Sequence, residues 1–397
     1  MSARTHTGSA GSLSGYLVID LTRALAGPHA AMMLGDLGAR VIKIENPDGG
    51  DDTRGWGPPF VGPESDREST YFLSTNRNKE SIVLDLKSDS DLELLSSLIG
   101  RADVLIENFR AGTLDRLGFP PHRLFELNPR LVVLSITGFG HDGPEGGRAG
   151  YDQIAQGEAG LMSLTGSGLD DPQRVGVPIA DLLSGIYGAY GVLAALLERE
   201  QTGKGQVVRT SLLASIVGAH AFQGTRWTVA GEVGSAQGNH HPSIAPYGLF
   251  KCQGGAVQIS VGSDGLWRRF CELVHFDPES AQWRTNGDRV SNRVGLIAAI
   301  EVAFSTTDPE TLLTRLADAG IPAGKVRNIR EVYEWDQTRS QGLLIDVIHE
   351  TLGEIALPGP PLRFFNDGGE EVTRNEHVAP PTLGQHSEQI RAEAASW

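Results

Sequence analysis

The feature that most constrains the fold is a regular alternation of short apolar runs and helical patterns between residues 16 and 139. The runs are rich in Val, Ile and Leu, which is typical of strands buried on both faces of a sheet. A β-α-β alternation predicts parallel strands joined by right-handed crossovers. We therefore expect a doubly wound, mostly parallel, Rossmann-like α/β domain. Its predicted strands are 16–23, 40–46, 81–86, 103–109 and 131–139.

The alternation ends after one further predicted strand, 206–213. Residues 214–231 have a helical pattern, and two strand patterns then flank Gly254-Gly255, as in a hairpin. More helical patterns follow, at 265–274, 294–304 and 310–319. They predict a smaller α+β domain. We expect a large domain over 1–215, a small domain over 225–325, and a C-terminal segment, 326–397, that returns to the large domain.

The segment 175–200, VGVPIADLLSGIYGAYGVLAALLERE, contains one acid at a junction. The run Val175–Ala180 predicts a buried strand, and a helical pattern follows Asp181. Asp181 has two interpretations: a helix N-cap, or a carboxylate at the carboxyl end of a strand, where open α/β sheets bind ligands. Glycine is unfavourable inside a helix, so its recurrence here indicates that another element closely approaches that face. The glycines are Gly185, Gly188 and Gly191.

Composition excludes several classes of function. The formal net charge of −15 argues against nucleic-acid binding. Cys252 and Cys271 are the two cysteines and have no metal-ligand spacing, which indicates a reducing compartment. The first 15 residues lack the apolar region of a signal peptide and are expected to form a loose tail. No apolar run approaches the ~18 residues of a membrane span. We expect a cytoplasmic protein without membrane association.

Two motifs resemble known sites only superficially. Gly138–Gly143 matches GxGxxG, but the chain continues into a polar loop instead of the helix that a dinucleotide fingerprint requires. It is interpreted as a flexible active-site loop or a plain turn. His240-His241 has no acid or cysteine at ligand spacing, so no metal site is predicted.

Basic, aromatic and amide side chains follow several predicted strands. Arg54 and Trp56 lie in the glycine-containing loop 47–57, which is either a ligand loop or a solvated acidic turn. Asn108 and Phe109 end another strand. The basic side chains in these regions are also open to interpretation as ordinary surface charge. They are Arg77, Lys79, Lys87 and Arg116.

Several segments resemble one family over nearly the whole chain. They include LTRALAGPHAAMMLGDLGARVIKIENP, TNRNKESIVLDLK, ADVLIENFRAGTLDRLGF, GVPIAD with GIYGAYGVLAAL, APYGLFKC and PPTLGQHSEQI. The chain is similar to the class III coenzyme A (CoA) transferases, which include formyl-CoA transferase and share a fold with α-methylacyl-CoA racemases. The resemblance implies an interlocked homodimer, CoA and acyl-CoA as substrates, a free carboxylic acid as the second substrate, and no permanently bound cofactor.

The resemblance also implies residue roles. Asp181 matches the nucleophile, which attacks the thioester to give a mixed anhydride and then an aspartyl-CoA thioester. The loop 238–248 corresponds to the family's oxyanion loop but lacks the poly-glycine run of formyl-CoA transferases. Trp56, His240 and His241 are candidates for the substrate side. The expected CoA-binding positions are Arg23, Ala24, Leu25, Ala26, Asn46, Leu84, Lys87, Asn108, Phe109, Arg116 and Tyr151.

Tyr151 bears on the choice between transferase and racemase. The racemases carry His at this position and use it as a base. Tyrosine has a reference pKa near 10, which makes it a poor base at neutral pH, so the transferase is favoured and a 2-methylacyl-CoA racemase is the alternative. A CoA-binding protein without activity is a third possibility, in which Asp181 is only a cap. The sequence does not name the acids.

Overall fold

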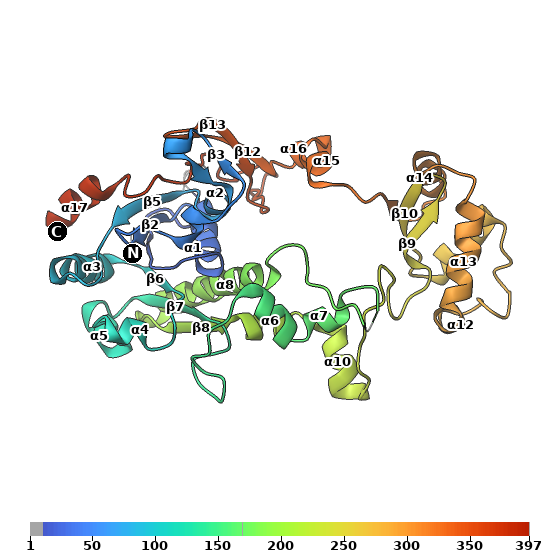
Figure 1. Ribbon diagram of the computed structural model, residues 1–397, viewed down its shortest axis with the longest axis horizontal. Helices are drawn as coiled ribbons and strands as arrows, with labels where there is room; N and C mark the ends of the chain where they lie inside the picture. The colour runs from blue at the N-terminus through green and yellow to red at the C-terminus, as the bar shows by residue number, and fades with distance from the viewer. Residues whose placement is uncertain (1–10, 169, 397) are drawn as a thin grey trace. The chain divides into compact units, whose positions relative to one another are not determined.

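The computed structural model describes residues 11–168 and 170–396, and the contacts within it group the chain into two units (Figure 1). The large unit comprises 11–161, 175–230 and 336–396. The small unit comprises 162–174 and 231–335. Residues 1–10, which contain most of the expected N-terminal tail, lie outside the described part.

A six-stranded sheet in the order β5-β2-β1-β6-β7-β8 forms the centre of the large unit, and each neighbouring pair is parallel. The expectation of a large parallel α/β sheet is therefore confirmed. Successive strands run outwards from β1 to β5, and the chain then crosses to β6 on the other side of β1. The switch point lies between β1 and β6. The strands are β1 (Leu17–Asp20), β2 (Arg40–Glu45), β5 (Lys79–Val83), β6 (Val104–Glu107), β7 (Val132–Thr137) and β8 (Val207–Ser211).

Except in the edge strand β5, alternate residues of the strands enter separate cores on the two faces of the sheet. Val132 and Leu134 of β7, for example, belong to the core under the helices α1 (Ala26–Asp36) and α8 (Ile179–Thr202). Val133 belongs to the core under α3 (Asp89–Arg101), α5 (Pro121–Leu127) and α17 (Ser387–Ala395). Both faces are covered, which is why the strands show no polar alternation.

The remaining elements of the large unit are short segments around this sheet. They are η1 (Asp52–Gly55), β3 (Phe60–Val61), η2 (Glu64–Asp66), β4 (Glu68–Ser69), α2 (Thr70–Thr75), α4 (Thr113–Arg116), α6 (Asp152–Glu158), α9 (Leu212–Gly218), α10 (Ala221–Ala230), α16 (Asp336–Ser340), β12 (Leu344–His349) and β13 (Gly353–Pro358). The helix α7 (Leu161–Leu164) begins in the large unit and ends in the small one.

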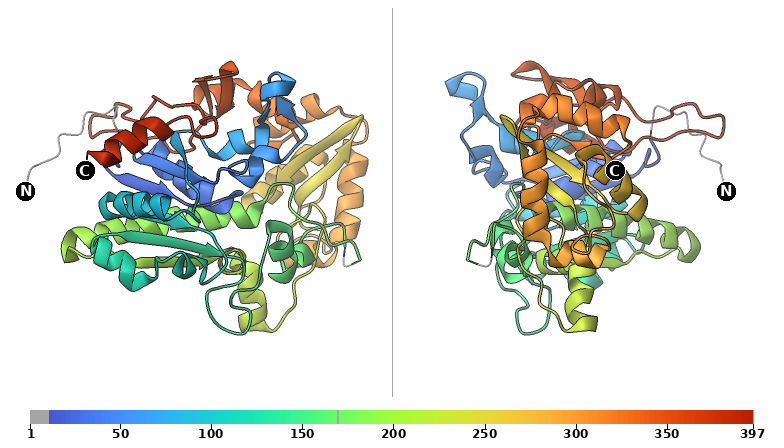
Figure 2. Two further views of the ribbon diagram at one scale, coloured as in Figure 1. Left: turned by 60° about the vertical axis from the view of Figure 1, so that its left-hand side comes forward. Right: turned by 90° about the vertical axis from the view of Figure 1, so that its right-hand side faces the viewer.

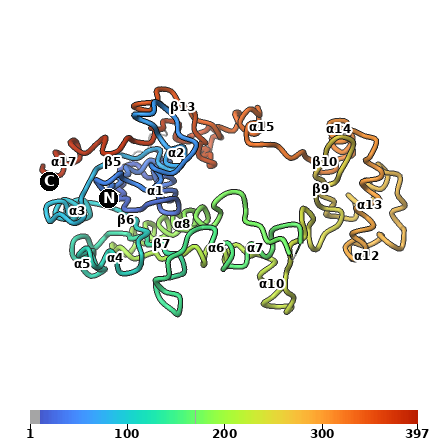
Figure 3. The backbone as a smooth tube through the Cα atoms, in the orientation of Figure 1, coloured from blue at the N-terminus to red at the C-terminus, as the bar shows by residue number. Residues whose placement is uncertain are grey.

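The C-terminal segment packs against the edge of the sheet at β5 (Figures 2 and 3). The His386 N–H donates to the Ser81 carbonyl oxygen at 2.9 Å, and the Val83 N–H donates to Ser387 Oγ at 3.1 Å. These hydrogen bonds join residues about 300 positions apart in the chain. Elements from both ends of the sequence therefore build the large unit.

The small unit has its own apolar core, with Trp267, Phe270 and Phe304 at its centre. Its sheet consists of the predicted hairpin, β9 and β10, with a short third strand, β11. All pairs are antiparallel, and helices pack against the sheet. The bounds are β9 (Tyr247–Cys252), β10 (Gly255–Ser260), β11 (Ala323–Gly324), α11 (Asp264–Val274), α12 (Asn286–Ser291), α13 (Arg293–Phe304), α14 (Pro309–Asp318) and α15 (Ile329–Tyr333).

The helix α8 corrects one expectation. It has 24 residues, and its mean hydropathy of 1.5 makes it long and apolar enough to cross a membrane, so one segment does meet that criterion. The helix nevertheless packs on β7 and β8 within the core. A core helix in contact with a sheet satisfies the same test of length and composition.

Candidate active site

The run Val175–Ala180 is not a strand, which corrects the first interpretation of the Asp181 segment. α8 begins at Ile179, Pro178 is its N-cap residue, and Asp181 lies in the first turn of the helix. The run contains Gly176 and Pro178. Proline has no N–H for a sheet ladder and suits the start of a helix. Asp181 is therefore neither the N-cap nor the end of a strand.

Asp152 performs the capping role that the sequence suggested for Asp181. Its Oδ1 accepts hydrogen bonds from the Ala180 N–H at 2.7 Å and the Asp181 N–H at 3.3 Å. Its Oδ2 accepts one from Gln156 Nε2 at 2.7 Å, and Gln156 Oε1 accepts the Val175 N–H at 2.9 Å. An acid on α6 thus satisfies the free N–H groups of α8. The Asp181 carboxyl group is not needed as a cap.

The Asp181 carboxyl group is half-buried. No donor of a hydrogen bond to it is found among residues 11–168 and 170–396. Burial raises its pKa to about 7, and the neighbouring Asp152 carboxylate contributes. A carboxyl group that titrates near neutral pH without a structural partner is a candidate functional group.

Tyr71 lies near this acid, and Trp56 packs on Tyr71. Burial and the negative charges of Asp181, Asp152 and Asp51 raise the pKa of Tyr71 to about 12, so its hydroxyl group faces these carboxylates in its protonated form. The Trp56 ring meets the Tyr71 ring edge-on, with centroids 5.1 Å apart. Trp56 was expected near the substrate, and the structure places it beside Tyr71.

The glycine stripe on α8 permits close packing, as the sequence indicated. A β-carbon on Gly185 would lie 2.8 Å from the Ala26 carbonyl oxygen, and one on Gly188 would lie 2.8 Å from Leu134 Cδ2. Gly191 similarly faces Val208. Asp181 lies about one turn before Gly185 on α8. It is therefore close to the start of α1.

The turn before α1 contains four of the predicted CoA-binding positions. Arg23 and Asn108 join the ends of β1 and β6: the Arg23 N–H donates to Asn108 Oδ1 at 2.9 Å, and Asn108 Nδ2 donates to the Arg23 carbonyl oxygen at 2.7 Å. Ala24 has a φ of 64°, in the left-handed region. Leu25 and Ala26 begin α1, which has neither a side-chain cap nor an acid in its first turn.

The other predicted positions are more dispersed. Asn46 follows β2 and donates to the Gly50 carbonyl oxygen at 2.7 Å. The Leu84 side chain is fully buried in the core, so only its backbone can meet a ligand. Phe109 is partly buried against the same core. The exposed positions are Lys87, Arg116 and Tyr151, the last with 68% of its surface accessible.

His240 and His241 belong to the small unit. His240 lies edge-on to Phe250 at 5.3 Å, and His241 stacks on Tyr247 at 5.2 Å. Burial and then the Arg293 charge hold both histidine pKa values below their usual value. In the described ranges, no three His, Cys, Asp or Glu side chains gather as metal ligands would.

The GxGxxG segment forms a closed loop and does not open a helix. The ends of the longer loop 138–150, which contains this segment, meet: a β-carbon on Gly138 would lie 2.7 Å from the Gly150 nitrogen. Within the loop, His141 Nε2 lies 2.6 Å from Ser135 Oγ, and Ser135 donates to the buried Glu107. These contacts anchor the loop to β6 and β7.

No role for Tyr71, Asp152 or Asp51 is predicted from the sequence. Asp152 follows Tyr151 directly and begins a helical pattern, and an acid in the first turn of a helix is an available signal. That signal explains why Asp152 is favourable in the first turn of its own helix, α6. It does not predict that the acid caps another one. Tyr71 carried no signal, because its neighbours at the site come from distant segments.

The fold and site together define an α/β protein with a half-buried carboxyl group near the carboxyl edge of a doubly wound sheet. The chain belongs to CoA-transferase family III, whose model matches residues 13–387. It is an enzyme of this CaiB/BaiF type, and the family resemblance is confirmed.

Relatives of known activity support this placement. The chain is 37% identical over 387 residues to the succinyl-CoA:glutarate CoA-transferase of Homo sapiens, covering 97% of this chain and 86% of the relative. It is 39% identical over 386 residues to the succinate–glutarate CoA-transferase of Agrobacterium fabrum, covering 96% and 95%. A crystal structure of a CaiB/BaiF family protein from Brucella suis matches with a TM-score of 0.84 and 37% identity, covering 97% of this chain and all of that one.

Proposed function

We propose that this enzyme moves CoA from an acyl-CoA donor to a free carboxylic acid, with Asp181 as the nucleophile. One observation carries the assignment: Asp181 lies at the start of α8 while Asp152 supplies the cap. The carboxyl group is consequently free to react, and its raised pKa of about 7 leaves a substantial ionised fraction at neutral pH.

The reaction proceeds through covalent carboxylate chemistry. The Asp181 carboxylate attacks the donor thioester carbonyl, the C–S bond breaks, and CoA leaves as a thiolate. The thiolate attacks the aspartyl carbonyl of the mixed anhydride, which releases the donor acid and leaves an aspartyl-CoA thioester. The incoming carboxylate displaces the thiolate from this thioester. The thiolate then attacks the carbonyl of the incoming acid, which forms the new acyl-CoA and regenerates Asp181.

The CoA is proposed to bind at the carboxyl edge of the sheet, where the Arg23–Asn108 hydrogen bonds close the switch point between β1 and β6. Ligands bind at such points in open α/β sheets. The proposed contacts of the CoA are Arg23, Ala24, Leu25, Ala26, Asn46, the Leu84 backbone, Lys87, Asn108, Phe109, Arg116 and Tyr151. Trp56, His240 and His241 are proposed to face the acyl group.

Dicarboxylic acids and their CoA thioesters are the proposed substrate class. The human relative is described as acting on succinyl-CoA and glutarate, and the Agrobacterium relative is described by succinate and glutarate. Both match nearly the whole of this chain. A reducing cytoplasm is the proposed location, in keeping with two free cysteines in the described residues.

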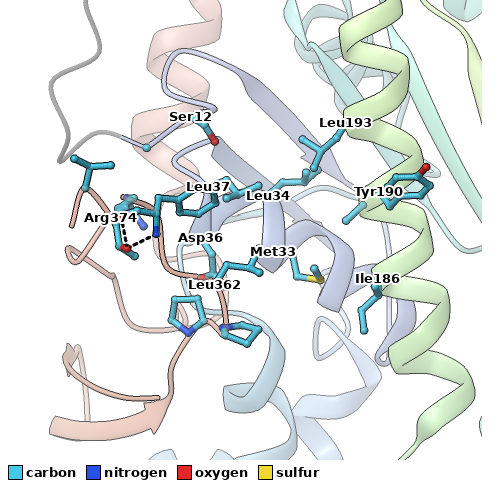
Figure 4. Close-up of a pocket in the computed structure, with 17 residues that line it drawn as sticks. Ser12, Met33, Leu34, Asp36, Leu37, Ile186, Tyr190, Leu193, Leu362 and Arg374 are labelled. Atoms are coloured by element: carbon cyan, nitrogen blue, oxygen red, sulfur yellow. Dashed lines mark hydrogen bonds between the residues drawn. The ribbon is translucent and has the colours of Figure 1, made fainter. Parts of the chain in front are cut away.

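We propose a homodimer in which a second copy of the chain covers the apolar surface that the large unit exposes. Met33, Leu37, Ile186, Tyr190 and Leu193 line a mostly apolar groove of about 430 Å³ between α1, α8 and the C-terminal segment (Figure 4). Tyr190 is 70% exposed. The helix α10 has no buried residue and presents exposed aromatic rings. Large exposed apolar patches are typical of interaction surfaces.

Trapping of the covalent intermediate tests the proposed function. The enzyme is incubated with succinyl-CoA, treated with hydroxylamine, and analysed by peptide mass spectrometry. A hydroxamate on Asp181 is expected, and its absence during measurable turnover excludes this nucleophile. Turnover in deuterated water addresses the racemase alternative: α-deuterium incorporation into a 2-methylacyl-CoA, without CoA transfer, would establish the racemase.

A further inference from the structure

A cluster of buried charges lies beneath the turn that begins α1. Asp20, Lys43, Asp51 and Lys79 are each at most 2% exposed, and they lie in or shortly after the strands β1, β2 and β5. Charges in such positions are costly unless they are paired and hydrogen-bonded. Lys43 Nζ lies 2.8 Å from Asp51 Oδ2, and Lys79 Nζ lies 2.9 Å from Asp20 Oδ2. The proposed reaction uses none of these groups directly.

The cluster forms hydrogen bonds with the backbone of the turn. Lys43 Nζ donates to the Thr22 carbonyl oxygen at 2.8 Å, and Lys79 Nζ donates to the Pro28 carbonyl oxygen at 2.9 Å. Between these points, the Ala24 N–H donates to Asp51 Oδ1 at 3.2 Å. Each contact is to main-chain atoms. The cluster therefore holds the backbone of the turn, together with the hydrogen bonds between Arg23 and Asn108.

Ala24 requires this support. Its φ of 64° lies in the left-handed region, which residues other than glycine adopt only where surrounding contacts impose it. The α1 helix that follows has no side-chain cap of its own to fix its entry. The hydrogen bond from Ala24 to Asp51 is thus the contact that holds the strained residue directly.

Asp51 also fixes the neighbouring loop. Its Oδ1 accepts the Thr53 N–H at 3.0 Å and the Thr53 hydroxyl at 2.8 Å, which caps η1. Trp56 follows η1 and packs on Tyr71 beside Asp181. One carboxylate consequently joins two loops: the turn that carries the Arg23–Ala26 positions, and the loop that carries Trp56.

We infer that Asp51, held in place by its ion pair with Lys43, is a positioning residue that presets the Arg23–Ala26 turn for CoA. The inference rests on the proposed function, because the turn is a CoA-binding element only in a CoA-transferase site. Asp51 itself does not touch the reacting atoms. It acts through the Ala24 backbone and the capped loop.

Binding of free CoA, measured by calorimetry, tests the inference together with steady-state kinetics. Asp51→Ala removes the acceptor for Ala24 and is expected to raise the Kd for CoA and the KM for acyl-CoA about tenfold. The KM for the acceptor acid should change less than twofold. Asp51→Asn keeps an oxygen for the Ala24 N–H but loses the charge opposite Lys43. Asp51→Asn is the second variant, which should fold even if Asp51→Ala fails to fold, and its Kd for CoA should rise about threefold.

Asp103→Ala is the matched control. The Asp103 carboxylate pairs with the buried Arg199 at 2.9 Å and accepts the Leu17 N–H at 2.9 Å, but at the amino edge of the same sheet. The Asp103→Ala variant should have a lower Tm and an unchanged Kd for CoA. An unchanged Kd in folded Asp51→Ala or Asp51→Asn overturns the inference, as does an equal rise in Asp103→Ala. If the wild-type enzyme neither binds CoA nor transfers it, the proposed function is refuted, and the inference is refuted with it.

Discussion

Asp152 caps the helix on which Asp181 lies: its Oδ1 is 2.7 Å from the Ala180 nitrogen and 3.3 Å from the Asp181 nitrogen. One carboxylate therefore has a structural role, and the carboxyl group of the proposed nucleophile is not needed for capping. The same proximity of two acids favours the protonated form of Asp181.

The pH dependence of kcat/KM should follow the Asp181 pKa. The attacking form is the carboxylate, so kcat/KM should rise with pH through about 7. Asp152→Asn keeps an oxygen for the cap and removes the negative charge, so the midpoint should move to lower pH. Rates measured from about pH 5 to 9 check this. Glu158→Gln, at the end of the same helix α6, should leave the midpoint unchanged.

Asp181→Asn should reduce CoA transfer by about 10³-fold or more, because an amide is a much poorer nucleophile than a carboxylate. CoA release from succinyl-CoA in the presence of glutarate measures the loss. Glu198→Gln changes an exposed acid near the far end of α8 and should retain wild-type activity. Retention of activity in Asp181→Asn would refute the nucleophile assignment.

Asp181 should also make stability depend on pH. Its folded-state pKa of about 7 lies above the unfolded value of 3.8, so the folded state binds more protons between these limits. The unfolding free energy contributed by Asp181 therefore falls as pH rises from about 4 to 7. One pKa unit corresponds to about 1.4 kcal/mol, and partial exposure reduces the effect, so Asp181→Asn should be more stable than wild type by about 1–3 kcal/mol at pH 8. Denaturant unfolding at pH 8 should reveal this difference, and at pH 4 it should nearly vanish.

Gly185→Ala should destabilise the large unit by about 1–3 kcal/mol, since the new methyl group meets a backbone oxygen that cannot move without displacing α1. Gly100→Ala in α3 is the control. Its methyl group would have no neighbour closer than 4.0 Å, so it should be neutral or stabilising by up to about 1 kcal/mol. Equal effects in thermal unfolding would show that the α1–α8 packing is not tight.

The apolar groove should be an interface between two copies. Leu193→Asp places a charge among the groove residues and should convert the dimer to a monomer, because a buried unpaired charge is costly. Sedimentation velocity measures the change. Ile348→Lys alters an exposed apolar residue outside the groove and should remain dimeric. A monomeric wild-type protein would contradict the proposal.

The sequence alone predicted the parallel sheet, the small-unit hairpin and the close packing on α8. These features depend on local periodicity and on turn residues, both of which can be read from the amino-acid sequence. The family resemblance identified Asp181 as the candidate nucleophile. The segment 175–180 was predicted wrongly because six apolar residues suit either a buried strand or the approach to a helix. The hydrogen bonds from the first residues of α8 to Asp152 on α6 favour the start of a helix here, and Asp152 is almost 30 residues away in the chain.

The sequence by itself determined which residues are acids and where strands and helices alternate. Only the tertiary structure decided what each acid does. Asp152 and Asp181 are 29 residues apart in the chain, and no local pattern tells which one takes the N–H groups of α8. Likewise, Asp51 meets Ala24 because β1 and β2 are paired in the sheet. Hydrogen bonding and burial, which set a carboxylate's pKa and availability, are properties of the neighbours that folding supplies.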